Sequence, residues 1–383
     1  MKRESWVSDA DRAIALACAE VKLIRAVTPE NTDQEIARLE QAFERGHPTA
    51  PNFRYEPCSI RPELPLALER LAEFLDGVSP LGRIYAGRAR ELFLEASIIH
   101  AVGSPKLTAL ARVRFIGESE QEKTDLSAAD QLAHDWARLP VEEATDDADM
   151  VESSDPNDPD SLFSAMSREA GRYRLAMRVV VQPGMASLAA TADGALLIAK
   201  GRRIRRRDVE RTVLHEIEGH ALPRRRAMGL SVGIFSLGTA CGIDDQEGRA
   251  LLIEEKRGYC DQARKKELGM RHIAARAALD GADFVEVVAL LRSCGAAVRG
   301  AVRIAARVAR GATGEGGLGR EVVYLPGRIR VSRAQQSELG PVIEVAMSKG
   351  RVSASAAPVL AALVPEALGL VILSESSWAD AAS

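Results

Sequence analysis

Two histidines and a glutamate in one short segment have the side chains needed to bind a metal ion and to move a proton. The segment spans residues 215–220 and reads HEIEGH. Neutral imidazoles are common nitrogen ligands of Zn²⁺, and a carboxylate beside the first imidazole can accept a proton from water at the metal. The segment therefore predicts a zinc site in which His215 and His220 are ligands and Glu216 acts on the proton.

The spacing of the two histidines does not suit a regular α-helix. The common zinc-peptidase pattern H-E-x-x-H places its histidines four residues apart on one helix face. Here they are five residues apart, which turns the second side chain roughly 140° away from the first. A π-bulge would restore the shared face, and Gly219 would give the backbone that freedom. The sequence thus predicts a distorted helix, and without the distortion the site fails.

A third ligand is required, because a catalytic zinc site has three protein ligands and one open position. Residues 244–255 read DDQEGRALLIEE and look like the start of a second helix. Glu247 could donate its carboxylate from this helix, packed antiparallel to the first. Glu254 and Glu255 are competitors, but Glu254 lies two turns further on and is expected to face solvent or a partner of a ligand.

The elements before the motif look like a small sheet. Residues 174–182 are rich in β-formers, and residues 194–199 form a second apolar run after the turn signal Asp193-Gly194. An edge strand of such a sheet would hold an extended peptide beside the metal. Asp208, which follows a run of arginines, is expected to cap the helix that carries the histidines.

Composition places the chain among globular, helix-rich proteins. Hydrophobic residues make up 46% and charged residues 27% of the chain, which is ordinary for a soluble domain. The formal net charge of −3 argues against general nucleic-acid binding. The five cysteines form no C-x-x-C pair, so we expect reduced thiols in a cytoplasmic protein. Neither a signal peptide nor a membrane span is expected.

The paired motifs HEIEGH and QEGRA (246–250) resemble the family named for a Q-E-G-L-A motif, whose animal members are the microtubule-associated tyrosine carboxypeptidases. The family pattern is H-E-x-x-x-H followed by a [TQ]-E-[EQ]-G-L-A-like segment. Further landmarks are Pro80-Leu81, Gly103-Ser104-Pro105 and a stretch at 307–327 similar to R-G…G-G…[KR]-[DE]-x-x-Y-L-x-G. The resemblance covers about residues 50–345.

This resemblance implies one Zn²⁺ per chain, bound by His215, His220 and Glu247, with Glu216 as the general base. It also implies removal of a C-terminal residue, which in the animal members is a tyrosine after an acidic tail. The expected partner is therefore the C-terminus of a peptide or protein, with an acidic one as an option, and neither nucleic acid nor a membrane.

A carboxypeptidase also needs a cation for the terminal carboxylate of its substrate, ideally a bidentate arginine. The sequence does not choose among four candidates, which are Arg303, Arg307, Arg310 and Arg320. Tyr324 is the candidate donor to the negative charge that develops on the carbonyl oxygen. It could equally be a tyrosine packed on a strand.

Two residues depart from the family pattern. Glu218 stands where a small or β-branched residue is usual and could be a partner of an imidazole. Arg249 replaces a leucine and could pair with a carboxylate. Two other functions stay open. One is a dipeptidyl-peptidase-like zinc aminopeptidase, and the other is a non-catalytic binding module that uses the basic patch Arg202–Arg226 for an acidic partner.

We expect a mainly helical α+β protein with a zincin-like metallopeptidase core. Residues 1–140 read as a helical N-terminal region that forms one wall of the cleft. Residues 141–162 are rich in acidic residues and are predicted to be a linker or loop, or alternatively a flap over the arginines. Residues 163–383 would form the zinc-binding catalytic region.

Overall fold

The computed structural model describes residues 5–117, 119–141, 149–192 and 194–369. Across these residues the chain is mainly helical, with one three-stranded and one two-stranded sheet. This confirms the predicted α+β, mainly helical class. The zincin-like core stays a prediction.

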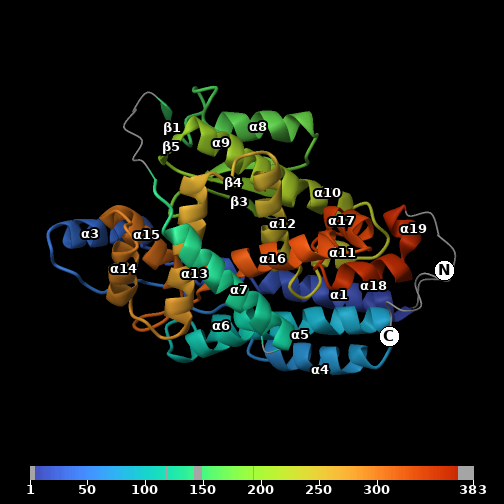
Figure 1. The fold of residues 1–383 in the computed structure, drawn as a ribbon. Coiled ribbons are helices and arrows are strands. Elements are labelled where there is room, and N and C mark those ends of the chain that lie inside the picture. Colours follow the sequence, from blue (N-terminus) through green and yellow to red (C-terminus); the bar gives the residue numbers. More distant parts are fainter. Residues whose placement is uncertain (1–4, 118, 142–148, 193, 370–383) are drawn as a thin grey trace.

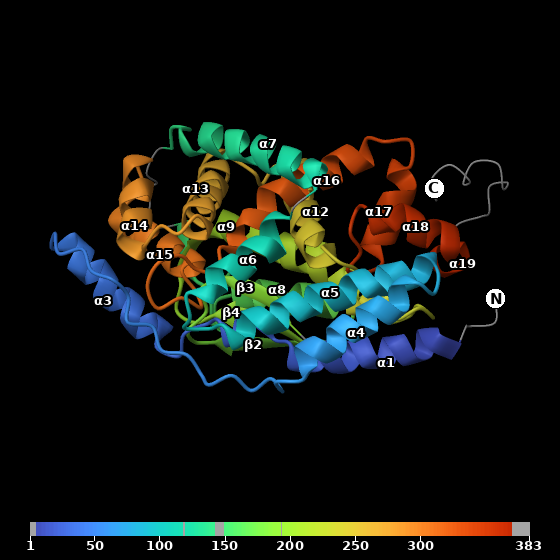
Figure 2. The ribbon, with the colours of Figure 1, turned by 90° about the horizontal axis from the view of Figure 1, so that it is seen from below.

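The regular elements in the described part of the N-terminal region are all helices. Its helices are α1 (Ser5–Glu20), α2 (Leu23–Ala26), α3 (Thr32–Glu44), α4 (Leu64–Asp76), α5 (Pro80–His100), α6 (Lys106–Ile116) and α7 (Glu120–Ala137). α4 buries Leu64, Leu68 and Leu75 at helical spacing, and α4 and α5 lie side by side in Figures 1 and 2. Ser79 caps α5, because its hydroxyl accepts a hydrogen bond from the Gly82 amide at 3.1 Å.

The strands follow α7, and helix α8 (Leu162–Arg172) lies among them in the chain. β1 (Met150–Glu152) pairs antiparallel with β5 (Arg203–Arg205). The second sheet has the order β2 (Arg178–Gln182), β4 (Ala195–Ala199), β3 (Ala189–Ala192), with β2 parallel and β3 antiparallel to β4.

Two details of the predicted sheet were wrong. The turn at Gly194, a glycine with φ of 73°, joins β3 to β4 and does not join the two predicted strands. β3 was missed because AATA has weak β propensity. Met150–Glu152, which we placed in an irregular linker, forms β1, and Ser153 and Ser161 in the same segment are buried. Residues 142–148, the first part of the acidic run, lie outside the described residues.

After β5 one continuous helical segment runs through α9 (Arg206–Leu214), η2 (His215–Ala221) and α10 (Leu222–Ala227). Asp208 is not its N-cap, since the helix starts earlier, at Arg206. Asp208 instead accepts a hydrogen bond from Arg211 at 2.6 Å within the first turns.

The remaining elements are helical. They are α11 (Ile234–Leu237), α12 (Gly242–Lys256), α13 (Gln262–Leu279), α14 (Phe284–Ser293), α15 (Val298–Val308), η3 (Arg320–Val323), α16 (Tyr324–Gln335), α17 (Gly340–Ser348), α18 (Ala356–Leu363) and α19 (Pro365–Leu368). Among the described residues no helix is long and apolar enough to cross a membrane.

The largest hydrophobic cluster joins both ends of the chain. It takes buried residues from 7–111 and again from 227–368. A second cluster lies between the three-stranded sheet, α8 and the α9–η2 segment, and a third joins α7, α12, α13 and α16. In Figure 1 the sheet and α8 form one side, α4 and α5 the opposite side, and α12 lies between them. The predicted division into regions 1–140 and 163–383 stays a prediction, but the two share a core.

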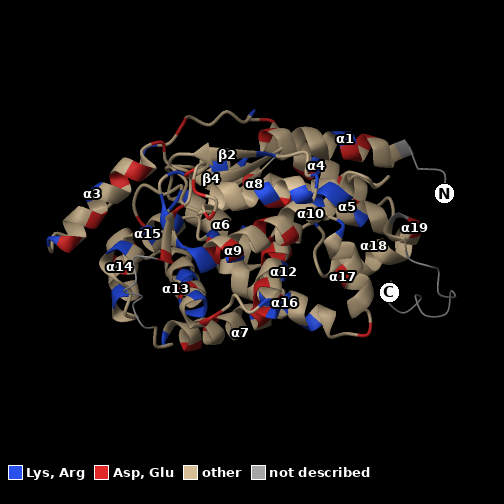
Figure 3. Ribbon diagram, turned by 90° about the horizontal axis from the view of Figure 1, so that it is seen from above, with Lys and Arg blue, Asp and Glu red and all other residues tan. Residues whose placement is uncertain are grey.

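Charges of both signs are interspersed along most helices (Figure 3). The arginines of the basic patch predicted between Arg202 and Arg226 do not gather at one place but are spread from just before β5 to the end of the helical segment. Arg206 and Arg224 lie at its opposite ends, about 27 Å apart at 1.5 Å per residue. Arg206 and Arg207 moreover pair with Asp160 and Asp261.

Candidate active site

The two histidines lie on a π-helix. η2 spans His215–Ala221 between two α-helical segments. In a π-helix the backbone hydrogen bonds join residues five apart, so side chains at that spacing share a face. The Nε2 atoms of His215 and His220 are 3.2 Å apart, which confirms the predicted distortion of the helix.

Gly219 contributes to this geometry by lacking a side chain and not, as predicted, by its backbone freedom. It is not one of the glycines with a positive φ. A Cβ atom at this position would lie 2.7 Å from the Cβ of Ala250 on α12. Gly219 therefore allows α12 to pack closely against η2.

Helix α12 carries Glu247 to the histidines. It runs antiparallel to η2, because His220 contacts Gln246 near its start and His215 contacts Glu254 near its end. Glu247 Oε2 lies 3.3 Å from His215 Nε2 and 3.5 Å from His220 Nε2. The three side chains are 10 to 14% exposed.

The outer nitrogen of each imidazole has an acceptor. His215 Nδ1 donates to Glu254 Oε1 at 2.7 Å, and His220 Nδ1 donates to Gln246 Oε1 at 3.1 Å. With protons assigned to Nδ1 from these partners, both Nε2 lone pairs point toward Glu247. Three electron-rich atoms then face one another and repel unless a cation or proton lies among them. Two imidazoles and one carboxylate are a donor set that suits Zn²⁺.

The local electrostatics also favour a positive charge at this point. Burial lowers the pKa of His215, but hydrogen bonds with Glu247 and Glu254 outweigh burial and raise it from 6.5 to about 10. Burial raises the pKa of Glu247, but the charge of His220 and the hydrogen bond with His215 lower it well below 4.5. A bound cation would take the place of the proton that this cluster attracts.

Glu216 is buried beside the sheet. Its Oε2 accepts a hydrogen bond from the hydroxyl of Thr191 at 2.7 Å. Thr191 belongs to β3, which is an edge strand of the three-stranded sheet. The structure thus places the candidate general base in contact with a strand edge, one residue after His215.

The four candidate arginines have different surroundings. Arg320 Nη2 lies 3.2 Å from Glu247 Oε1, the oxygen that faces away from the histidines. Arg307 and Arg310 share the buried carboxylate of Glu321, at 2.9 and 3.1 Å.

Arg303 differs from the other three because it is exposed at the surface. Its guanidinium pairs with Glu40 at 2.6 Å. The structure therefore brings Arg320 next to the ligand cluster, keeps Arg307 and Arg310 buried on one shared carboxylate, and leaves Arg303 outside.

Tyr324 is the first residue of α16 and half-buried. The predicted alternative, a tyrosine packed on a strand, is wrong, because this segment is helical. Burial raises the pKa of Tyr324, and the carboxylate of Glu247 raises it further.

Sequence reasoning missed two positioning side chains of this site, Gln246 and Thr191, and left Glu254 open between solvent and a partner of a ligand. Glu254 is fully buried and contacts His215, so facing solvent was the wrong alternative. Seven residues separate it from Glu247, a spacing that returns a helix to the same face and could have been used. Gln246 and Thr191 left no such signal.

Of the two departures from the family pattern, Arg249 pairs with a carboxylate as predicted. It contacts Glu344 on α17 and also donates to the carbonyl oxygen of Glu218 at 3.3 Å. Glu218 is not a partner of an imidazole. It faces away from the histidines and lies 3.6 Å from Arg257.

A second group of metal-binding residue types consists of Glu91, Cys241 and Asp244. Two buried arginines already compensate its carboxylates, since Arg114 pairs with Glu91 at 2.7 Å and with Asp244 at 2.8 Å, and Arg88 also pairs with Glu91. We read this group as a buried ion network that joins α5, α6 and α12.

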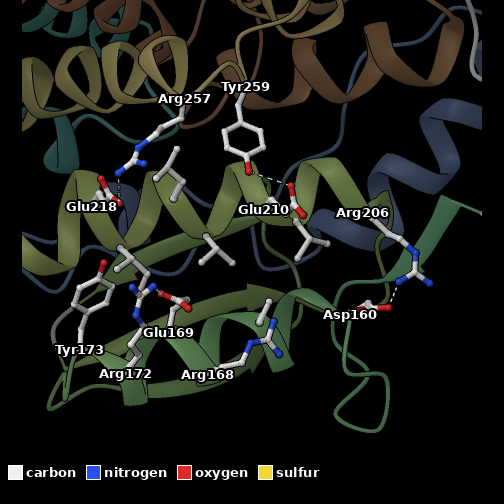
Figure 4. A pocket seen from close by; sticks show the side chains of 15 residues that line it. Asp160, Arg168, Glu169, Arg172, Tyr173, Arg206, Glu210, Glu218, Arg257 and Tyr259 are labelled. Carbon is white, nitrogen blue, oxygen red and sulfur yellow. Dashed lines mark hydrogen bonds and ion pairs between the residues drawn. The ribbon is translucent and has the colours of Figure 1, made fainter.

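A pocket with a volume of about 570 Å³ lies apart from the ligand cluster, whose residues do not line it. It lies between α8 and the α9–η2 segment, as Figure 4 shows. Val213 of α9 and Ile217 and Glu218 of η2 line it from the side opposite the histidines. Tyr259 and Arg257 approach it from the loop after α12. The chemistry of the donor set, and not the size of the cavity, identifies the candidate active site.

Fold and site together describe a mainly helical α+β protein with a buried His-His-Glu cluster and a nearby buried glutamate. Residues 40–372 match the sequence profile of the family described as microtubule-associated tyrosine carboxypeptidase. Because this match covers most of the chain, the protein belongs to that family, which confirms the resemblance seen in the motifs. No curated protein matches the chain.

A crystal structure from Colwellia psychrerythraea, described as a candidate lipoprotein, aligns with a TM-score of 0.41 at 10% identity. The alignment covers 80% of this chain and 66% of that one, so this chain spans just under two thirds of its length. We draw no argument from so distant a likeness.

Proposed function

We propose that this chain is a zinc-dependent metallocarboxypeptidase that removes a C-terminal residue, tyrosine or another aromatic one, from a peptide or protein. The observation that carries the proposal is the convergence of His215 Nε2, His220 Nε2 and Glu247 Oε2 to within 3.5 Å. Membership of the tyrosine carboxypeptidase family supports it. These three residues would hold one Zn²⁺ per chain.

When bound, the ion would supply Lewis acidity that polarises the scissile carbonyl and makes nearby water more acidic. Glu216 would accept the proton of that water and pass it to the leaving amine. The hydroxyl of Thr191 fixes one oxygen of Glu216, which leaves the other for proton transfer. The outer edge of β3 would pair with the extended backbone of the substrate, in a zincin-like arrangement.

Arg307 and Arg310 are our candidates for the terminal carboxylate of the substrate. They share the one carboxylate of Glu321, so the group keeps a positive charge. Arg320 would mainly hold Glu247 in place. Tyr324 would donate to the oxygen on which negative charge develops.

Acidic residues upstream of the cleaved bond would be favoured by further arginines. Burial lowers the pKa of Arg202, and the neighbouring charges of Arg303 and Arg307 lower it further. Arg202 lies between β4 and β5, and Arg303 and Arg307 lie on α15. Asp33 and Glu40 raise the pKa of Arg202 and so offset part of the repulsion among the three guanidinium groups. An acidic substrate tail would relieve this repulsion, in a way that weakens with salt.

The test is mass spectrometry of a peptide library with varied C-terminal residues, incubated with and without a chelator. We expect loss of one C-terminal residue, aromatic residues first, and no loss with chelator. N-acetylated peptides should still be cleaved, whereas C-terminally amidated peptides should not. The opposite pattern would favour a dipeptidyl-peptidase-like zinc aminopeptidase.

Glu216→Gln separates metal binding from chemistry. We expect the variant to keep about one zinc ion per chain and to lose turnover by a factor on the order of 10² to 10⁴, the usual size of general-base catalysis. Metal analysis and peptide cleavage are both measured. Wild-type protein without zinc, or Glu216→Gln with unchanged turnover, would contradict the proposal.

A binding module without catalysis is the remaining alternative. It predicts tight, salt-sensitive binding of an acidic peptide with no cleavage. Because the arginines of the predicted basic patch lie at opposite ends of a helical segment, the structure offers this alternative no continuous patch along the helix. The cytoplasm remains our expected location, because all five cysteines are free thiols.

A further inference from the structure

Glu254 is placed to orient the imidazole of His215. It lies on α12 seven residues after Glu247, and none of its surface is exposed. Its Oε1 accepts the hydrogen bond from His215 Nδ1 at 2.7 Å. Since an ionised carboxylate only accepts hydrogen bonds, this contact keeps the proton on Nδ1 and leaves Nε2 free.

Arg264 holds Glu254 from a different helix. Its Nε lies 2.9 Å from Glu254 Oε2 and its Nη2 lies 3.0 Å from Oε1. This forked contact fixes the plane of the carboxylate as well as its position. Arg264 sits in the first turn of α13, where its amide donates to the N-cap Asp261 at 2.9 Å. Both α12 and α13 therefore hold the imidazole of His215 in place.

The second histidine has a weaker counterpart. His220 Nδ1 donates to Gln246 Oε1 at 3.1 Å. The amide nitrogen of Gln246 is buried and finds no acceptor among the described residues. An unpaired buried donor costs free energy. The contact with His220 therefore offsets the cost of this orientation of Gln246. An imidazole that donates to a neutral amide is less basic than one that donates to a carboxylate.

We propose that Glu254, clamped by Arg264, and Gln246 are positioning residues that set the tautomer and the ring plane of the two histidines. Glu254 has the larger effect, so that His215 is the stronger nitrogen donor of the site. This proposal rests on the proposed zinc site. Neither residue is assigned a ligand or catalytic role.

The test measures the zinc affinity of the full-length protein by competition with a chromophoric chelator, and the absorption spectrum of the Co²⁺-loaded protein. The variants are Glu254→Gln and Gln246→Leu. The control is Glu255→Gln, the neighbouring carboxylate of α12, which is partly exposed and pairs with Arg328 at 2.6 Å. The melting temperature of each metal-free protein shows whether folding has changed.

We expect Glu254→Gln to weaken zinc binding about 10- to 100-fold, the usual effect of losing such a partner, and to alter the Co²⁺ spectrum. Gln246→Leu should weaken it less, and Glu255→Gln should leave both readouts as in wild type. Equal affinities and spectra for Glu254→Gln and Glu255→Gln would overturn the proposal. Wild-type protein that binds no zinc would instead overturn the proposed function.

Glu254→Gln leaves Arg264 buried beside a neutral side chain, which could lower the melting temperature of the metal-free protein. In that case the double variant Glu254→Gln/Arg264→Met decides, since it also removes the arginine, which in Glu254→Gln keeps only its pair with Glu267. Zinc binding that stays weak in the double variant supports the positioning role. Affinity that returns to the wild-type value refutes it.

Discussion

At the scale of single residues, the contact between Thr191 and Glu216 joins the sheet to the candidate base. The hydroxyl donates to Oε2 of the carboxylate at 2.7 Å, and Glu216 is otherwise packed in the interior. A buried carboxylate with one fixed oxygen can present the other in a defined direction. Thr191 is therefore a positioning residue of the proposed reaction.

Replacing Thr191 by valine keeps the shape of the side chain and removes the donor. Hydrogen bonds to charged groups are worth about 1.5–3 kcal/mol, so we expect kcat/KM for peptide cleavage to fall by about 10-fold or more. Thr191→Ser keeps the hydroxyl and should stay close to wild type. Equal activity of the valine and wild-type proteins would show that Glu216 does not depend on this contact.

The candidate ligands and base could be predicted because their chemistry restricts residue type and spacing. The histidine pair at 215 and 220 and the carboxylate at 247 satisfy such a restriction along the sequence. Thr191 and Gln246 could not be predicted, because a hydroxyl or an amide becomes informative only when the fold brings it to a partner far away in sequence. Arg303 is the opposite case. Its residue type suits a carboxylate-binding site, but it lies exposed on α15, away from the ligand cluster.

At the scale of elements, α12 is held between η2 and α16 by small residues. The Cβ of Ala250 faces Gly219 on one side of α12. On the other, a Cβ added at Gly248 would lie 2.2 Å from the backbone carbon of Gly327 on α16. Backbones that approach this closely leave no room for larger side chains. The position of Glu247, one residue before Gly248, depends on both contacts.

Gly219→Ala should therefore destabilise the protein although alanine is the better helix former. The added methyl would lie 2.7 Å from Ala250 Cβ, and overpacking of this kind costs about 1–3 kcal/mol. Gly171→Ala in α8 meets nothing within 4 Å and should stabilise by up to about 1 kcal/mol. Unfolding in denaturant measures both free energies.

The same experiment contains its own check. Adding Ala250→Gly to Gly219→Ala removes the clash and should recover part of the lost stability. If Gly219→Ala is as stable as wild type, the close approach of η2 and α12 is not required. The ligand geometry would then have to be explained without it.

Element types were largely predictable from the sequence, and the reasons for the failures are physical. The π-helix followed from a histidine spacing that a regular helix cannot use. β3 could not be recognised, because four small residues gain their strand conformation from pairing with β4 and not from their own propensity. The sequence predicts that Gly219 matters for its backbone freedom. In the structure it matters because it lacks a side chain, which lets α12 pack closely.

At the scale of the whole molecule, buried ion pairs join helices distant in sequence. Glu321 on η3 receives both Arg307 and Arg310, from α15 and the segment after it. Burial raises the pKa of Glu321, but the charges of Arg310 and Arg307 outweigh burial and lower it from 4.5 to about 2. The native state thus binds a proton at this site less readily than the unfolded chain does.

Stability from Glu321 is therefore fully present above pH 4.5 and is lost as the pH falls toward 2. The shift corresponds to about 3 kcal/mol, of which about 1 kcal/mol disappears between pH 6 and pH 3.5. Glu321→Gln should destabilise the protein at pH 6 and less so at pH 3.5. Glu44→Gln, which removes a surface pair with Arg299, should change stability by under about 0.5 kcal/mol at both pH values. A destabilisation by Glu321→Gln that does not depend on pH would contradict this account.

The pocket beside α8 and the candidate ligands lie on different sides of one helical segment. Residues 213, 217 and 218 face the pocket, whereas His215 and His220 face α12. Successive side chains of a helix point in different directions. One helical segment therefore contributes both to the pocket and to the ligand cluster. If the substrate bound in the pocket, its scissile bond would lie behind the helix and away from Glu216.

Substitution of the pocket wall tests this separation. Arg168 and Arg172 project from α8 into the pocket (Figure 4), so Arg168→Ala/Arg172→Ala changes its charge without touching the ligand cluster. We expect kcat/KM for peptide cleavage to stay within about twofold of wild type, as for most surface substitutions. Arg307→Met, which removes one of the two candidate partners of the substrate carboxylate, should raise KM instead. A fall of more than tenfold in the α8 variant, with Arg307→Met unchanged, would place the substrate in the pocket and move the active site to the other face of η2.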